Sequence, residues 1–284
     1  GHGGARAVAD ILFGEVNPSG KLPLTFPKTY RDCPTSLNFP GEFGEVTYGE
    51  GIFVGYRYYD TKDVEPLFPF GFGLSYTDYE ITGMKLSADT YANDATDPLK
   101  ISVTVRNAAH NAGKEVVQVY VRDPKSTLQK PEKELKAFTK VALAPGESKT
   151  VTLELMPKDF ASYDTALQKW TIEPGTYEIL VGDSSRTIMA DAKISVTGKN
   201  PYGYSLRSSC GFIAANPEAM AACSEVLGEA FDVDAFISQA IYFTGTPFGK
   251  YLERIQGMLA DTPQGQQEVL DRLSERLEEI AVPE

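Results

Sequence analysis

The chain has 284 residues and a formal net charge of −12. This charge repels phosphate backbones and anionic lipid surfaces, so nucleic-acid and membrane partners are disfavoured. A hydrophobic content of 42% and a charged content of 23% are ordinary for a soluble globular protein of one large or two ordinary domains. Three scattered cysteines do not make a disulfide framework and favour a reducing compartment, so a cytoplasmic location is favoured over secretion. No apolar run is long enough to cross a bilayer.

The chain opens on an amphipathic helix that is already under way at Ala5. Apolar residues recur at helical spacing as far as Leu12, and Gly14 is placed to end the helix. The first residue is Gly, and neither a Met nor a signal peptide precedes this pattern. We therefore expect the chain to be the carboxy-terminal part of a longer protein.

A turn and a short extended segment are predicted next. Asn17 to Gly20 reads Asn-Pro-Ser-Gly, a strong turn signal because Pro fixes φ and Gly tolerates positive φ. Leu22 to Phe26 follows as a short strand or extended segment, and Pro23 within it suits the edge of a sheet.

The segment from Tyr48 to Thr77 mixes aromatic residues with glycine and proline. Four tyrosines lie between Tyr48 and Tyr59, and a Gly/Pro-rich run follows from Pro66 to Gly73. Rings supply buried area, whereas a flexible linker would be rich in Gly and Ser without rings. We interpret the segment as an ordered connector that packs between two bodies.

The middle of the chain alternates apolar and polar residues with a period of two. The clearest runs begin at Ile101, Val117 and Val151, and turn signals such as Ala144-Pro145-Gly146 separate them. This pattern predicts an all-β sandwich whose strands have one buried face. Trp170, the one tryptophan, is predicted to be a core or core-edge anchor.

The last part of the chain is predicted to be helical. Asn216-Pro217 and Thr262-Pro263 each place a capping side chain before a proline at the first helical position. Further helices are expected between Asp234 and Gly245 and between Pro247 and Ala260, and the last helix has an apolar face from Val269 to Ile280. Short helices bury little alone, so we expect them to pack on the sandwich or on another domain.

Three motifs in the same order resemble a known family. The connector reads YGEGIFVGYRYYD and then FPFGFGLSYT, which resembles the junction between the α/β sandwich domain and the fibronectin-III-like domain in β-glucosidases of glycoside hydrolase family 3. Upstream, Gly3 to Pro27 resembles the close of that α/β sandwich domain; downstream, Arg106 to Val121 and Lys133 to Leu155 resemble the β-sandwich. The last eighty or so residues lie outside this resemblance.

The expected fold is therefore mainly β, with a fibronectin-III-like (immunoglobulin-like) sandwich as its centre. We predict a remnant of the α/β sandwich domain over residues 1–40 and the connector over residues 41–78. The sandwich domain follows over residues 79–198 and a helical extension over residues 199–284.

Glycoside hydrolysis needs two carboxyl groups, one as acid and one as nucleophile or base. The resemblance implies a nucleophile Asp on a barrel domain and an acid/base Glu in the α/β sandwich domain, both upstream of Gly3. We therefore assign no catalytic residue and expect this segment to be inactive alone. Two distant histidines and three cysteines give little support to a Ser-His-Asp triad or a zinc site, and no metal or cofactor is expected.

Four residues of the connector are the best candidates for binding substrate: Glu50, Tyr56, Arg57 and Asp60. Arg presents a bidentate fork, and Tyr a flat ring that fits a sugar face. The alternative, which we favour, is an internal ion pair of Arg57 with Glu50 or Asp60 that fixes the connector.

The resemblance implies the C-terminal part of a retaining enzyme that hydrolyses terminal non-reducing β-D-glucosyl residues. Its partners would be a β-glucoside or oligosaccharide substrate and the N-terminal catalytic barrel domain, and a homo-oligomer stays open. Two alternatives remain: another family 3 glycosidase such as a β-xylosidase, or a non-catalytic β-sandwich that binds carbohydrate or mediates contacts. A binding module should expose a row of aromatic rings, and Tyr120 and Trp170 are the ring candidates on the predicted strands.

Overall fold

The computed structural model describes residues 2–165, 167–198 and 200–280. The chain divides into two compact units, Gly1–Lys199 and Asn200–Glu284. Each unit has its own cluster of buried hydrophobic residues.

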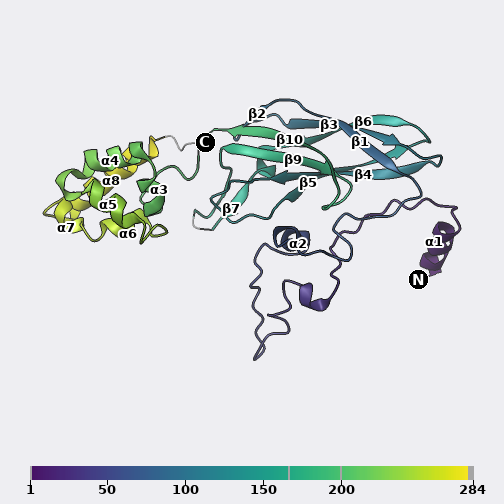
Figure 1. Cartoon of the computed structure of the whole chain (residues 1–284), viewed down its shortest axis with the longest axis horizontal. Helices are drawn as coiled ribbons and strands as arrows, with labels where there is room; N and C mark the ends of the chain where they lie inside the picture. Colours follow the sequence, from purple (N-terminus) through teal and green to yellow (C-terminus); the bar gives the residue numbers. More distant parts are fainter. Residues whose placement is uncertain (1, 166, 199, 281–284) are drawn as a thin grey trace. The chain divides into compact units, whose positions relative to one another are not determined.

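The first unit contains a two-layer β-sandwich (Figure 1). One sheet has the order β1-β3-β6, and the other has the order β2-β10-β9-β4-β5. All strand pairs within these sheets are antiparallel except β10 with β2. The strands are β1 (Tyr79–Leu86), β2 (Thr90–Ala92), β3 (Leu99–Asn107), β4 (Gly113–Arg122), β5 (Glu134–Leu143), β6 (Ser148–Leu155), β9 (Gly175–Gly182) and β10 (Ile188–Thr197). A separate ribbon pairs β7 (Ser162–Asp164) with β8 (Lys169–Thr171), after the 3-10 turn η2 (Pro157–Asp159).

The sandwich core is built from the alternation seen in the sequence. On β3, Ile101, Val103 and Val105 are fully buried, and the residues between them face outward. Ile101 lies opposite Leu153 on β6, so the apolar sides of neighbouring strands coincide. Pro145 and Gly146 form the predicted turn, in which the Glu147 amide donates to the Ala144 carbonyl at 3.0 Å. The predicted mainly β sandwich is therefore confirmed.

Strand β4 departs from the predicted pattern because both of its faces are buried. Gln118 and Tyr120 point away from the core yet are 3% and 0% exposed. Residues of the connector cover them: the Gln118 amide donates to the Gly71 carbonyl, and the Tyr56 ring meets the Tyr120 ring edge-on. Gly71 has a φ of +80°, and a Cβ there would collide with the Gln118 amide, so this close approach requires glycine.

The N-terminal helix α1 (His2–Leu12) ends before Gly14, as predicted, but its apolar face is not covered. Val8 and Leu12 are exposed. The predicted turn at Asn17 to Gly20 is wrong: the chain turns between Phe13 and Val16 and then runs extended. The reason is that the Asn17 side chain bonds outward, donating to Thr77 and Ala112 and accepting from Ser75 and Tyr76.

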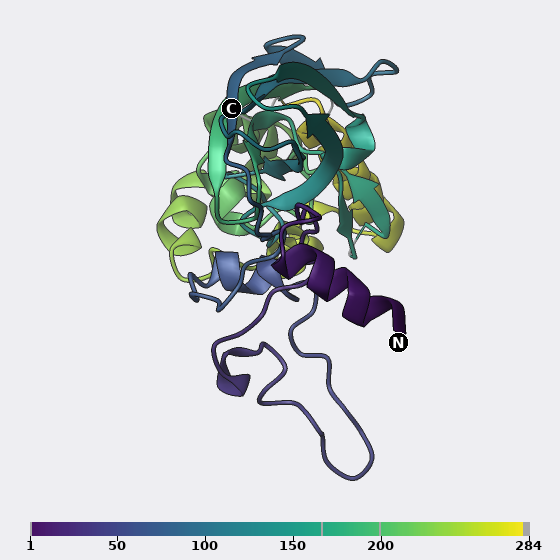
Figure 2. The same ribbon diagram turned by 90° about the vertical axis from the view of Figure 1, so that its right-hand side faces the viewer.

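The extended segment after Asn17 pairs with the end of the connector. The Leu22 amide donates to the Phe72 carbonyl at 2.8 Å, and Phe26 forms an isolated antiparallel bridge with Phe68. Between Phe26 and Gly55 the chain is mostly irregular, with one short 3-10 turn, η1 (Tyr30–Asp32), and forms a long excursion (Figure 2). Tyr48, Ile52 and Val54 are exposed, so the start of the aromatic stretch is only partly packed in this unit.

The second unit is helical. Its elements are α3 (Cys210–Ala214), α4 (Pro217–Leu227), η3 (Gly228–Ala230), α5 (Val233–Ala240), α6 (Phe248–Leu252), α7 (Gln256–Leu259) and α8 (Pro263–Glu278). Both predicted caps are confirmed: Asn216 accepts from the Ala219 amide at 2.9 Å and Thr262 from the Gly265 amide at 3.1 Å. The single helix expected between Pro247 and Ala260 is instead two short helices, α6 and α7.

These helices bury their apolar faces against one another. Phe236, Phe248, Leu273 and Leu277 are fully buried in one cluster of this unit, together with Cys210 and Cys223. Within the described residues 200–280, the helices together enclose a core that a single short helix could not form alone. The expectation that they also pack on the sandwich or on another domain stays a prediction.

Two aromatic predictions on the sandwich are also wrong. Trp170 is 70% exposed rather than a core anchor, because β8 belongs to the separate ribbon and not to either large sheet. Tyr120 is completely buried beneath the connector, so it is no candidate for an exposed binding ring.

Candidate functional site

The four candidate residues lie on and just before one short helix of the connector. Helix α2 (Tyr56–Thr61) begins after Gly55, whose φ is +54°, and ends at Lys62. Asp63 then takes a φ of +51° and turns the chain away. Tyr59 is buried, and Tyr56, Arg57 and Asp60 reach side chains or backbone of the sandwich.

Tyr56 is held between the connector and the sandwich. Its ring stacks on Phe70 with centroids 4.7 Å apart, and its hydroxyl accepts a hydrogen bond from the Leu135 amide at 2.9 Å. Burial raises the pKa of the Tyr56 hydroxyl, although the Leu135 amide and the nearby Arg57 oppose this shift. Both the ring and the hydroxyl of Tyr56 thus contact other groups of this chain.

Arg57 forms an ion pair with the sandwich and not within the connector. Its guanidinium lies 2.9 Å from a Glu134 carboxylate oxygen, and Lys136 lies 3.2 Å from the other oxygen of Glu134. The predicted pairing of Arg57 with Glu50 or Asp60 is therefore wrong. The partner is Glu134, the first residue of β5, which the sequence of the connector alone does not indicate.

Asp60 has an almost completely buried side chain. Its carboxylate is 3% exposed and lies 2.9 Å from Lys133 Nζ and 2.6 Å from Arg186 Nε. These contacts are ion pairs at close distance rather than well-aligned hydrogen bonds, since Asp60 Oδ2 and Arg186 Nε complete no hydrogen bond with a described group. Arg186 also donates to the Tyr59 and Val64 carbonyls, each at 3.0 Å. Arg186 therefore holds the end of α2 through an ion pair with a side chain and through hydrogen bonds to backbone carbonyls.

Glu50 differs from the other three candidates. Its Oε2 atom is buried and forms no hydrogen bond within the described part of the chain, and no described cationic side chain pairs with it. A buried carboxylate oxygen without a partner is costly.

Sequence reasoning missed Lys133, Glu134 and Arg186, the partners of the connector. Lys133 lies 73 positions after its partner Asp60, and Glu134 lies 77 positions after its partner Arg57. Arg186 lies 126 positions after Asp60. Hydrophobic periodicity locates strands but does not pair charges across the fold. No pattern in a single sequence could have found them.

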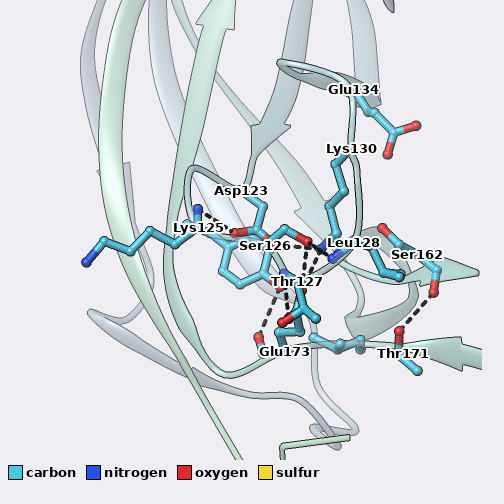
Figure 3. A network of polar contacts seen from close by, with 12 residues as sticks. Asp123, Lys125, Ser126, Thr127, Leu128, Lys130, Glu134, Ser162, Thr171 and Glu173 are labelled. Atoms are coloured by element: carbon cyan, nitrogen blue, oxygen red, sulfur yellow. Dashed lines mark hydrogen bonds and ion pairs between the residues drawn. The ribbon is translucent and has the colours of Figure 1, made fainter. Parts of the chain in front are cut away.

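A second polar cluster surrounds Lys130 in the loop between β4 and β5 (Figure 3). Lys130 Nζ lies 2.5 Å from Asp123 and 3.5 Å from Glu173. Glu173 also accepts from the Ser126 hydroxyl at 2.7 Å and the Thr127 amide at 2.9 Å. The adjoining cavity measures about 20 Å³, room for one water molecule. Both carboxylates are occupied in holding the loop, so this cluster is structural.

Within the described residues no group of three or more His, Cys, Asp or Glu side chains could hold a metal ion. Over the same residues, no helix combines the length and the apolar character that spanning a membrane requires.

The exposed apolar side chains are concentrated before the sandwich. Of the 27 exposed large hydrophobic side chains among the described residues, 18 lie between Val8 and Tyr76, and only four lie in the sandwich. They include Phe13, Leu37 and Phe43, each more than four-fifths exposed. Contiguous exposed apolar surface marks a site of contact with another surface.

Comparisons with known proteins agree with this organisation. Residues 1–76 match the model of the glycosyl hydrolase family 3 C-terminal domain, and residues 115–185 match that of the fibronectin type III-like domain. The thermostable beta-glucosidase B of Acetivibrio thermocellus is 42% identical over 282 residues, which cover 96% of this chain and 36% of the relative. An exo-alpha-(1->6)-L-arabinopyranosidase of Bifidobacterium breve is 47% identical over 198 residues, covering 70% of this chain and 26% of the relative.

Solved structures give the same result. A Bifidobacterium adolescentis beta-glucosidase aligns with a TM-score of 0.67 and 41% identity over 76% of this chain and 32% of its own. Beta-glucosidase 3B of Thermotoga neapolitana aligns with a TM-score of 0.62 and 46% identity over 68% of this chain and 26% of its own.

The match with the Acetivibrio relative reaches further than the sequence resemblance did. Because it covers 96% of the chain, it includes most of residues 200–284. The chain spans only about a quarter to a third of the length of these relatives. The two family models match residues 1–76 and 115–185, which are the segment before the sandwich and most of the sandwich itself. The chain belongs to glycoside hydrolase family 3, as the C-terminal portion of its fold.

Proposed function

We propose that this chain is the C-terminal part of a retaining β-glucosidase that hydrolyses terminal non-reducing β-D-glucosyl residues. The nucleophile Asp and the acid/base Glu would come from the upstream part of the enzyme. The likeness to beta-glucosidases of Acetivibrio and Bifidobacterium supports the reaction class.

The observation that carries the proposal is the uneven distribution of exposed apolar side chains. The sandwich buries its own core, whereas Val8 to Tyr76 leaves 18 large hydrophobic side chains exposed. Burial of such surface is the main favourable term in domain association. The segment therefore fits the rim of a domain whose remaining strands and helices lie on the upstream part.

Among the four candidate residues, we propose that Glu50 contacts substrate or the upstream part. Tyr56, Arg57 and Asp60 are bound to the sandwich, and Glu50 alone keeps a buried oxygen without any described hydrogen-bond or ion-pair partner. In this proposal the first three residues set the position of the connector, and Glu50 acts beyond it.

A second substrate class is favoured by one observation. Exo-alpha-(1->6)-L-arabinopyranosidases of two Bifidobacterium species are 46–47% identical to this chain, as similar as the glucosidases. This portion of the fold therefore tolerates different pyranosides. A β-xylosidase is the other alternative within the family.

The test combines the isolated chain with the upstream part of the Acetivibrio relative, cut where the match begins. We expect no hydrolysis of nitrophenyl β-D-glucoside by the chain alone and hydrolysis by the mixture. Nitrophenyl α-L-arabinopyranoside and β-D-xyloside, assayed in parallel, distinguish the alternatives. Turnover by the chain alone that is lost on Glu50→Gln would contradict the proposal, because it would place the catalytic acid in the connector.

A further inference from the structure

Two aromatic side chains stand exposed on the small ribbon of the sandwich. Tyr163 on β7 lies directly opposite Trp170 on β8. Trp170 is 70% exposed and Tyr163 is 50% exposed. Their ring centroids are 5.6 Å apart and their planes are inclined by 72°. The two ring planes are therefore steeply inclined to each other, and together they form an L-shaped aromatic surface.

Few large hydrophobic side chains of the sandwich share this exposure. Among its described residues, the others that are exposed are Phe138 and Met189, which lie on strands of the larger sheet and form no ring pair. A Trp or Tyr side chain can bury roughly 150–250 Å² of surface, so leaving both in water gives up a large contribution to folding. Smaller side chains would hold the ribbon together with less apolar surface in solvent.

The ribbon presents the two rings from a fixed base. Phe160, just before β7, lies in the sandwich core with its ring edge-on to Tyr177. Thr171, just after Trp170, is buried, and its hydroxyl donates to the Ser162 carbonyl at 3.2 Å. Because the ribbon is anchored on both sides, the two rings lose less conformational entropy when a ligand binds.

We propose that Tyr163 and Trp170 form a platform that binds a β-1,4-linked glucan chain. In such a chain the ring substituents are equatorial, so each pyranose presents a flat face of axial C–H groups that can stack on an aromatic ring. The Tyr163 hydroxyl and the Trp170 Nε1–H hydrogen-bond to no described residue and can reach the sugar hydroxyls at the edge of the ring. The choice of glucan rests on the proposed function.

The size of the patch favours a sugar over a protein partner. Two partly exposed rings offer on the order of 200–300 Å², whereas a specific protein interface buries about 800 Å² on each partner. One or two pyranose rings match the smaller area. A neutral glucan is also indifferent to the net charge of −12.

The single tryptophan gives a direct readout on the unmodified chain. Titration with cellohexaose should change the Trp170 emission in a saturable manner, and maltohexaose, whose α-linked chain curves, should bind at least tenfold more weakly. Tyr163→Ala keeps the fluorophore and should weaken cellohexaose binding about tenfold.

Electrophoresis through gels that contain hydroxyethyl cellulose provides a second measurement. The native chain should be retarded, and Trp170→Ala and Tyr163→Ala should migrate freely. Phe138→Ala, at a comparably exposed ring on β5, is the matched control and should be retarded like the native chain. Because the fluorescence titration needs no substitution, a variant that failed to fold would leave the test intact.

The results separate this inference from the proposed function. Hydrolysis of nitrophenyl β-D-glucoside by the chain plus upstream part should be unaffected by Trp170→Ala, since that substrate is too small to need the platform. Unchanged emission with cellohexaose, equal binding of maltohexaose, or equal loss of retardation in Phe138→Ala would overturn the platform. The platform would also be overturned if the upstream part changed the Trp170 emission and the glucan did not. None of these results bears on whether the mixture hydrolyses the small substrate.

Discussion

Asp60 joins the connector to the sandwich through an almost completely buried carboxylate. Its carboxylate faces Lys133, next to β5, and Arg186, in the loop between β9 and β10. Arg186 in turn donates to two carbonyls at the end of α2. One buried anion thus brings together three segments that are distant in sequence, and removing it would leave two cations without their partner.

Asp60→Asn should lower the free energy of unfolding by about 3 kcal/mol, because breaking a buried ion pair leaves uncompensated charge. Asp63→Asn is the matched control: Asp63 is 3.6 Å from the same Arg186, but its side chain is 96% exposed. Solvent-exposed pairs contribute about 1 kcal/mol or less. Urea unfolding of both variants measures the difference. Equal midpoints for the two variants would show that Asp60 does not fix the connector.

Buried tyrosines make the sandwich sensitive to alkaline pH. Burial raises the pKa values of Tyr120 and Tyr177 above the ordinary tyrosine value, and the carboxylates near Tyr177 add to its shift. Unfolded tyrosines lose their protons near pH 10, whereas these folded ones keep them. The stabilising contribution is therefore complete below pH 10 and declines as pH rises above it.

We expect the urea midpoint to fall steeply above about pH 10, and Tyr177→Phe to reduce that slope. At neutral pH the same variant should cost about 1 kcal/mol, for the lost hydrogen bond from the Tyr177 hydroxyl to the Glu173 carbonyl. Tyr163→Phe, at a half-exposed side chain, serves as the control. A pH slope that is the same in Tyr177→Phe as in the native chain would refute this assignment.

At the scale of elements, the sequence predicted what depends on local period and capping. Alternation located β3, β4 and β6, and the Asn-Pro and Thr-Pro pairs located the starts of α4 and α8. The sequence did not predict that the outer face of β4 is covered. Gln118 is buried by Gly71, 47 positions upstream, and Tyr120 by Tyr56, still further upstream. The partners of Arg57 and Asp60 were missed for the same reason: they are set by tertiary contact.

The helical elements offer a direct test of their shared core. Cys210 and Cys223 are fully buried in it, while Cys33, in the segment before the connector, is half-buried. Burial raises the pKa of the Cys223 thiol to about 12, so at pH 8 almost none of it is the reactive thiolate. A thiol reagent at pH 8 should label Cys33 readily and the other two only when urea unfolds the helices. Mass spectrometry of labelled peptides measures this, and fast labelling of Cys223 without urea would contradict the buried core.

For the whole molecule, the contrast lies between two complete cores and one uncovered segment. The sandwich and the helical unit each bury their apolar residues internally. Helix α1 and the connector loops do not, and their residues match the C-terminal domain model of the family. The division into segments at residues 40, 78 and 198 remains a prediction. In our account, the sandwich holds helix α2 in place, whereas helix α1 and the loops before α2 gain apolar cover from an upstream part.

Amide hydrogen exchange across α1 tests this account most directly. In the isolated chain we predict fast exchange from Ala5 to Gly14, since Val8 and Leu12 have no apolar cover, and slow exchange in the strands of the sandwich. Addition of the upstream part of the Acetivibrio relative should slow exchange in α1 and leave the sandwich strands unchanged. Slow exchange across α1 in the isolated chain, or no protection when the upstream part is added, would contradict the account.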